Sequence, residues 1–98
     1  MDIPGKCLIG ATSDVVDACK MIRIMIRLPD DGTPTGLNDG DITGWLAMHD
    51  GDDDVDSAAM HWMENVLPQN PHIESILHTP APCRFDWSDE KGDFVRTE

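Results

Sequence analysis

Hydrophobic residues recur at helical spacing in one long segment of this chain, residues 53–67. Every third or fourth position there is apolar, and Asp54, His61 and Glu64 fall on the opposite side. The apolar face contains Val55, Ala58, Ala59, Trp62, Met63, Val66 and Leu67. Pro68 cannot continue a helix. The pattern predicts a helix over residues 53–67, the clearest element of the chain.

Residues 13–28 fit two structures. Thr12 and Ser13 offer an N-cap, acidic residues follow in the first turn, and Lys20, Arg23 and Arg27 lie toward the end, which suits a helix dipole. The alternative is a strand in the second half, where isoleucines alternate with arginine and methionine from residue 22. We favour the helix because capping and charge order agree, and the strand remains open.

Shorter patterns predict the remaining elements. Residues 6–11 form an apolar run typical of a strand, and residues 29–41 are rich in turn residues. Residues 42–49 suit either a short helix or a strand. Asn70 followed by Pro71 predicts a short helix over residues 71–78. Residues 83–87 and 93–97 flank a turn and predict a β-hairpin.

These elements predict an α+β fold. The 98 residues are enough for one small domain, so we expect a single acidic globular domain over residues 1–98. In it, two to four helices pack with a short N-terminal strand and a C-terminal β-hairpin.

The charge distribution changes the picture. The chain carries a formal net charge of −12, and no lysine or arginine lies between Arg27 and Arg84. That section holds eleven carboxylates: Asp30, Asp31, Asp39, Asp41, Asp50, Asp52, Asp53, Asp54, Asp56, Glu64 and Glu74. Such a surface disfavours direct contact with nucleic acid or anionic membranes. It favours a basic partner.

The cysteines and apolar runs indicate a cytoplasmic protein. Three cysteines at irregular spacing fit a reducing compartment, and Cys7 and Cys19 lie in apolar stretches typical of a core. The first residues do not match a signal peptide. No apolar run approaches about 18 residues, so we expect no membrane span.

The cluster from Asp50 to Asp56 raises the question of calcium. Positions 50, 52 and 54 match the first ligands of an EF-hand loop, but Val55 replaces the required glycine and His61 the required glutamate. A local explanation is an acidic helix start capped by Asp52 or Asp53. An irregular, weak divalent-cation site remains an alternative. Histidine and cysteine intervals do not match a zinc site, and we expect no cofactor.

Motifs for catalysis are missing from the sequence. There is no GxSxG, no phosphate-binding loop, and no cysteine in an electropositive setting beside a histidine. We therefore expect a non-enzymatic protein.

The acidic turns are the expected contacts with a partner. A folded surface of fixed carboxylates can occupy a groove that normally binds phosphates. The predicted contact residues are Asp30, Asp31, Asp39, Asp41, Asp50, Asp52, Asp53, Asp54 and Asp56, with Trp45 or Met60 as an apolar anchor. We expect an inhibitor with a partly DNA-mimicking face, whose target is a basic protein or nucleoprotein complex.

In size, charge segregation and lack of catalytic motifs, the chain resembles small acidic phage proteins that inhibit host defence, including anti-CRISPR proteins. It is similar at the same level to acidic immunity proteins that neutralise basic nuclease toxins. The resemblance implies a CRISPR-Cas effector, or its nucleic-acid-binding groove, as the target in the host cytoplasm. Two alternatives remain open: a weak divalent-cation-binding or small metal-dependent domain built on Asp50–Asp56, and an immunity protein or adaptor with an apolar contact surface.

Overall fold

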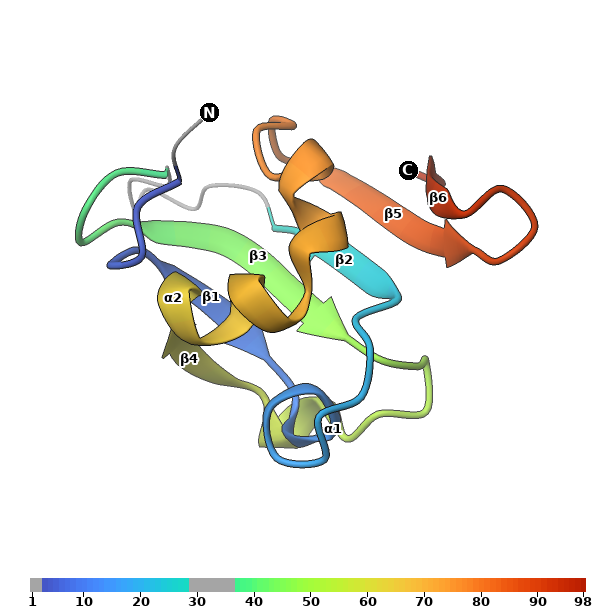
Figure 1. Ribbon diagram of the computed structural model, residues 1–98, viewed down its shortest axis with the longest axis horizontal. Helices are drawn as coiled ribbons and strands as arrows, with labels where there is room; N and C mark the ends of the chain where they lie inside the picture. Colours follow the sequence, from blue (N-terminus) through green and yellow to red (C-terminus); the bar gives the residue numbers. More distant parts are fainter. Residues whose placement is uncertain (1–2, 29–36) are drawn as a thin grey trace.

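A six-stranded mixed sheet organises the computed structural model, which describes residues 3–28 and 37–98 (Figure 1). The strands are β1 (Leu8–Ala11), β2 (Ile24–Arg27), β3 (Ile42–Met48), β4 (Ala59–Trp62), β5 (Cys83–Ser88) and β6 (Asp93–Arg96). Their order in the sheet is β4-β1-β3-β2-β5-β6. The β1–β3 pair is parallel and the other pairs are antiparallel. The α+β class is confirmed, with more sheet than we expected.

Short helices follow one another over residues 63–76 and lie in front of the sheet in Figure 1. They are α2 (Met63–Val66), η2 (Leu67–Gln69) and η3 (Pro71–Ile76), the last two being 3₁₀ helices. Pro71 opens η3, where its missing N–H costs nothing, so the predicted short last helix is confirmed. Two further helices, α1 (Ser13–Val16) and η1 (Val55–Ser57), lie outside this layer. Over the described ranges, no helix is long and apolar enough to cross a bilayer.

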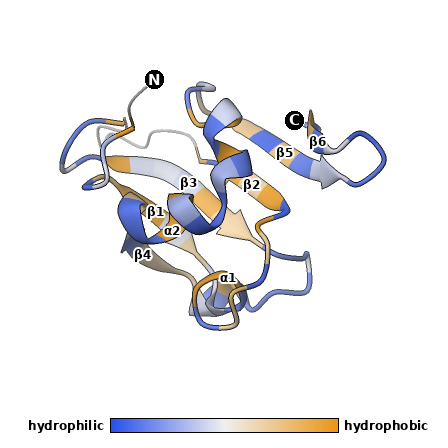
Figure 2. Ribbon diagram, in the orientation of Figure 1, coloured by the Kyte–Doolittle hydropathy of each residue, from blue (hydrophilic) through white to orange (hydrophobic). Residues whose placement is uncertain are grey.

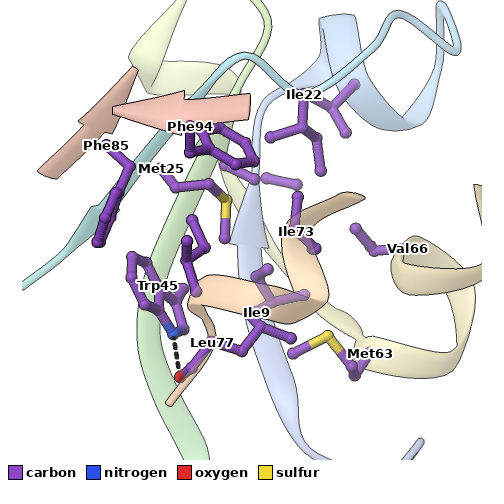
Figure 3. Packing of buried hydrophobic residues seen from close by; sticks show 14 of the residues in the cluster. Ile9, Ile22, Met25, Trp45, Met63, Val66, Ile73, Leu77, Phe85 and Phe94 are labelled. Carbon is purple, nitrogen blue, oxygen red and sulfur yellow. Dashed lines mark hydrogen bonds between the residues drawn. The ribbon is translucent and has the colours of Figure 1, made fainter. Parts of the chain in front are cut away.

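The core fills the space between this helical layer and the sheet (Figure 3). Because side chains alternate along a strand, Ile9, Met25 and Trp45 point toward the helices. They meet residues of the helical layer, including Ile73 and Leu77. The indole Nε1 of Trp45 donates a hydrogen bond to the carbonyl oxygen of Leu77 at 3.0 Å, which satisfies its buried polar atom.

A bulge in β3 lets it pair with β1. Leu8 lies opposite Ile42 but Gly10 lies opposite Leu46, so β3 contains two additional residues over this stretch. Gly44 takes up the irregularity at φ 81°, a conformation that glycine adopts without strain.

Arg27 is a buried cation that pairs with carbonyls. Its guanidinium donates to the carbonyl oxygens of Thr43 at 2.9 Å and of Thr79 at 2.8 Å, and to that of Leu77 at 3.2 Å. Burial lowers the pKa of Arg27. The side chain also lies over the ring of Trp45, 5.5 Å from its centroid. Arg27 is thus part of the fold and does not neutralise the acidic section.

The predicted helix over residues 53–67 is wrong. The segment instead divides into η1, the edge strand β4 and α2. Trp62 and Met63, which a helix would place on one face, lie on opposite sides: Trp62 is exposed and Met63 is buried. Residues 59–62 pair with β1, and this long-range pairing outweighs the local helical spacing.

The predicted helix over residues 13–28 is also wrong, and the alternative strand is confirmed. α1 covers only Ser13–Val16, and β2 covers Ile24–Arg27. Cys19 interrupts the segment with a left-handed backbone conformation, φ 55°. It is exposed, contrary to the core position that we expected, whereas Cys7 is buried as expected.

The shorter predictions agree better with the structure. The N-terminal strand is confirmed as β1, and the hairpin is confirmed as β5 and β6. Gly92 supplies the left-handed turn conformation between them, φ 63°. Residues 42–49, which suited either structure, contain the strand β3.

Candidate partner-binding surface

The loop between β3 and β4 contains the densest group of carboxylates. It appears as a hydrophilic segment at the end of β3 (Figure 2). Asp50, Asp52, Asp54 and Asp56 are exposed, whereas Asp53 is only 8% exposed. The five aspartates therefore divide into four surface residues and one internal residue. We refer to residues 50–56 as the acidic loop.

Asp53 fastens the acidic loop to the sheet. Its carboxylate accepts a hydrogen bond from the Thr12 hydroxyl at 2.7 Å. The backbone N–H of His49 donates to it at 2.7 Å, and that of Asp50 at 3.1 Å. Hydrogen bonds to an ionised carboxylate are stronger than neutral ones. The loop is thus held against the end of β1, and its neighbouring carboxylates are presented on a fixed backbone.

Further hydrogen bonds shape the rest of the loop. The Asp50 side chain accepts from the backbone N–H of Asp52 at 3.1 Å. Asp54 is the N-cap of η1 and accepts from the N–H of Asp56 at 3.0 Å. The expected cap by Asp52 or Asp53 belongs to the helix that does not form, and Asp54 instead caps the three-residue 3₁₀ helix η1. The Ser57 hydroxyl accepts from the Ser13 N–H at 3.0 Å and ties the loop to α1.

Two carboxyl groups in this region have shifted pKa values. A hydrogen bond shared with Asp53 raises the pKa of Asp14, and burial and the negative charge of Asp53 add to the effect. Burial alone would raise the pKa of Asp53. The hydrogen bonds donated by Thr12 and by the His49 N–H outweigh it and hold that pKa below its usual range. Of the two carboxyl groups, Asp14 therefore binds a proton more readily than Asp53.

Cations elsewhere in the chain are matched to other carboxylates. Arg23 pairs with Asp89 at 2.6 Å, Arg84 with Asp86 at 3.0 Å, and Lys20 lies 3.9 Å from Asp14. Lys6 pairs with Glu64. Within residues 3–28 and 37–98, Glu64 is the single carboxylate of the acidic section with an ion-pair partner. The exposed aspartates of the acidic loop thus have no counter-charge in the described parts of the chain.

The other predicted acidic contacts do not join the acidic loop. Asp39 and Asp41 precede β3, whereas the acidic loop follows it, so the two groups lie at opposite ends of that strand (Figure 1). The seven residues of β3 span about 20 Å at the usual strand rise. Asp41 accepts a hydrogen bond from the Asn38 N–H at 3.2 Å. Asp30 and Asp31 lie outside the described residues.

The two proposed apolar anchors have different surroundings. Trp45 is 2% exposed and belongs to the core, so its side chain is not on the surface. Met60 is 55% exposed on β4, four residues after the end of the acidic loop. Trp62, two residues further along the same strand, is 40% exposed, although the predicted helix placed it in the core. The exposed tryptophan of this edge strand is therefore Trp62, which pairs with Leu8 at the end of β4 away from the acidic loop.

The strand register brings further apolar residues to the face of the sheet opposite the helices. Gly10 pairs with Met60 on one side and with Leu46 on the other, and Ile26 pairs with Leu46. Paired residues point to the same face, so this row crosses four strands. Leu8 and Trp62 form a neighbouring pair. We call this side the open face. The alternation of Met60 and Trp62 with small or polar residues was the sequence signal that could have revealed it.

Other features of the surface offer less to a partner or a ligand. A groove of about 700 Å³ lies between η3 and the β5–β6 hairpin, with Glu74, Asp93 and Trp87 in its wall. The His72 ring stacks on Phe94 and donates through Nε2 to the Ile22 carbonyl at 2.8 Å, so its nitrogen serves the fold. Among the described residues, no group of three or more histidine, cysteine or acidic side chains is arranged to hold a metal ion.

Comparison with protein families, with curated proteins and with solved structures gave no match.

Proposed function

We propose that this chain is a non-enzymatic inhibitor that binds a basic, nucleic-acid-binding surface of a protein or nucleoprotein complex. Its target class includes CRISPR-Cas effectors, and its place of action is the cytoplasm. The observation that carries the proposal is the acidic loop, whose exposed aspartates have no internal counter-charge in the described chain.

The energetics favour a binding role for these carboxylates over a structural one. Repulsion among like charges destabilises a compact chain, and capping requires only Asp54. Asp53 holds the loop in place through three hydrogen bonds. A pre-organised charged surface loses little conformational entropy on binding, and it attracts a basic groove over long distances. These properties suit a protein that competes with nucleic acid for one groove.

The test compares two variants with the same change in net charge. The first is Asp52→Asn with Asp54→Asn and Asp56→Asn, in which asparagine preserves the turn and capping geometry. The control is Glu74→Gln with Glu90→Gln and Glu98→Gln, three exposed residues away from the acidic loop. Each chain is immobilised and exposed to a nuclease-treated bacterial lysate and to a panel of purified Cas effectors.

We expect the wild type and the glutamine control to retain the same nucleic-acid-binding protein. The asparagine variant should not retain this protein, and added duplex DNA should release it from the wild type. Retention that neither the asparagine variant nor DNA weakens would reject the proposal, as would the absence of any retained protein.

A further inference from the structure

The two edges of the sheet differ in their protection against pairing with another chain. β6 carries Asp93 and Arg96, one charge at each end, whereas β4 reads Ala-Met-His-Trp and contains no acidic or strongly basic residue and no proline. Charges and proline on an edge strand oppose the addition of a further strand. β4 lacks both, so its edge is open to pairing.

The backbone of β4 presents hydrogen-bonding groups at this edge. The N–H of Met63 donates to the Cys7 carbonyl at 2.8 Å, so Met63 and Cys7 form a hydrogen-bonded pair. In an antiparallel pair of strands every second residue pair is hydrogen-bonded, so His61 and Ile9, two residues further along, are hydrogen-bonded to each other as well. By the same alternation, the N–H and C=O groups of Met60 and Trp62 point away from β1. The C=O of Trp62, the N-cap of α2, accepts the first hydrogen bond of that helix. The groups left for pairing are the N–H and C=O of Met60 and the N–H of Trp62, which no backbone hydrogen bond from another segment of residues 3–28 and 37–98 reaches.

The side chains of these two residues continue the edge as an apolar surface. The side chains of Met60 and Trp62 project to the open face, Trp62 opposite the Leu8 side chain and Met60 opposite Gly10. Leu46 covers Gly10, since a Cβ placed on Gly10 would lie 3.6 Å from Leu46 Cδ1. A strand added along β4 would therefore find both unpaired backbone groups and an apolar floor.

The charges around β4 favour a basic segment as the occupant of its edge. The exposed carboxylates of Asp54 and Asp56 stand three to five residues before β4 and have no ion-pair partner among the described residues. At the other end of β4, Glu64 is paired with Lys6, whose ammonium lies over the Trp62 ring, so the acidic end of the edge is the one beside Ala59 and Met60. The net charge of −12 opposes a second copy of this chain at that edge. We infer that β4 is a docking edge, along which a basic extended segment of a protein partner adds as a seventh strand over Met60 and Trp62. The inference rests on the proposed function for the basic character of the partner.

The probe is a blocked synthetic peptide of about seven residues that alternates lysine and valine, which favours an extended conformation. It is titrated into the ¹⁵N-labelled chain, and the amide signals of Met60 and Trp62 and the indole signal of Trp62 are followed by NMR. We expect these signals to shift with the Lys-Val peptide and to remain in place with a Glu-Val peptide of the same length.

Variants separate backbone pairing from contact with side chains. Met60→Pro removes an outward N–H and should weaken binding about tenfold through the lost hydrogen bond and the steric block. Met60→Ala retains the N–H and should weaken binding about two- to threefold. Val55→Ala is the control, because Val55 is 57% exposed but lies in η1. If Met60→Pro disturbs the fold, a Lys-Val peptide methylated at alternate backbone nitrogens replaces it. Methylation along the peptide edge that faces β4 should abolish binding, and methylation along the other edge should not.

Three results would overturn the inference. Shifts confined to residues 50–57, with β4 unmoved, would leave the proposed function standing without strand addition. Equal effects of Met60→Pro and Met60→Ala would indicate side-chain contact alone. Self-association in sedimentation, with shifts of the β4 amides, would make a second copy the occupant. Conversely, peptide addition at β4 together with failed retention of lysate proteins and Cas effectors would count against the proposed function and not against the docking edge.

Discussion

On one face of the sheet Ile9, Met25 and Trp45 lie under the helical layer and are almost fully buried, whereas Leu8, Ile26 and Leu46 on the opposite face are half buried. The same three strands supply both sets by alternation. An antiparallel sheet that faces water usually carries polar residues on that side. The fold itself needs one apolar face, and the second is the face on which we propose contact with a partner.

The largest expected effect contrasts a tryptophan from each face. Trp45→Ala should lower the free energy of unfolding by about 3–5 kcal/mol, because it removes a buried ring and its hydrogen bond to Leu77. Trp62→Ala should lower it by less than about 1 kcal/mol. Urea unfolding followed by far-UV circular dichroism measures both. Equal losses would mean that the open face contributes to stability as the core does.

Within the acidic loop the same contrast holds between adjacent residues. Asp53→Asn should destabilise the fold by about 1–3 kcal/mol, because the amide replaces an ionised acceptor of three hydrogen bonds. Asp52→Asn should change stability by no more than about 0.5 kcal/mol. Thermal and urea unfolding at neutral pH compare the pair. A larger loss of unfolding free energy for Asp52→Asn than for Asp53→Asn would contradict the division between internal and surface aspartates.

The smallest effect is a dependence on pH. The raised pKa of Asp14 means that the folded state takes up a proton that the unfolded state lacks, between the ordinary carboxyl pKa and the raised one. This contribution to stability is present at low pH and is lost as pH rises through that window. The lowered pKa of Asp53 acts oppositely, and its contribution is lost as pH falls.

Asp14→Asn should therefore be slightly more stable than the wild type at neutral pH, because the amide carries no charge to repel the Asp53 carboxylate and binds no proton. Its stability should also decrease less as pH rises above the ordinary carboxyl pKa. Urea unfolding over a pH series measures both slopes, with Asp17→Asn as an exposed control. Identical slopes for Asp14→Asn and the wild type would contradict the raised pKa of Asp14.

Local signals in the sequence predicted the elements that local chemistry determines. The hairpin depends on a left-handed turn residue that Gly92 provides, and η3 begins at a proline. β2 and β4 depend on partners distant in the chain, so helical spacing and capping residues misled there. Periodicity is also a poor guide on an edge strand, where Met60 and Trp62 are apolar and exposed.

The candidate site was predictable in charge but not in arrangement. The lack of lysine and arginine between Arg27 and Arg84 already implied aspartates without counter-charge. The internal role of Asp53 depends on Thr12, 41 residues away, which no local pattern reveals. The burial of Trp45 and the exposure of Trp62 likewise follow from the sheet register.

The central claim is that the exposed aspartates of the acidic loop, which have no ion-pair partner among the described residues, recognise a basic surface together with the open face. The most direct test is the affinity of the chain for its captured partner, measured by calorimetry at low and at high salt. We predict a steep loss of affinity as salt rises, and a much shallower loss for the variant with Asp52, Asp54 and Asp56 replaced by asparagine. The same affinity at both salt concentrations would contradict the claim.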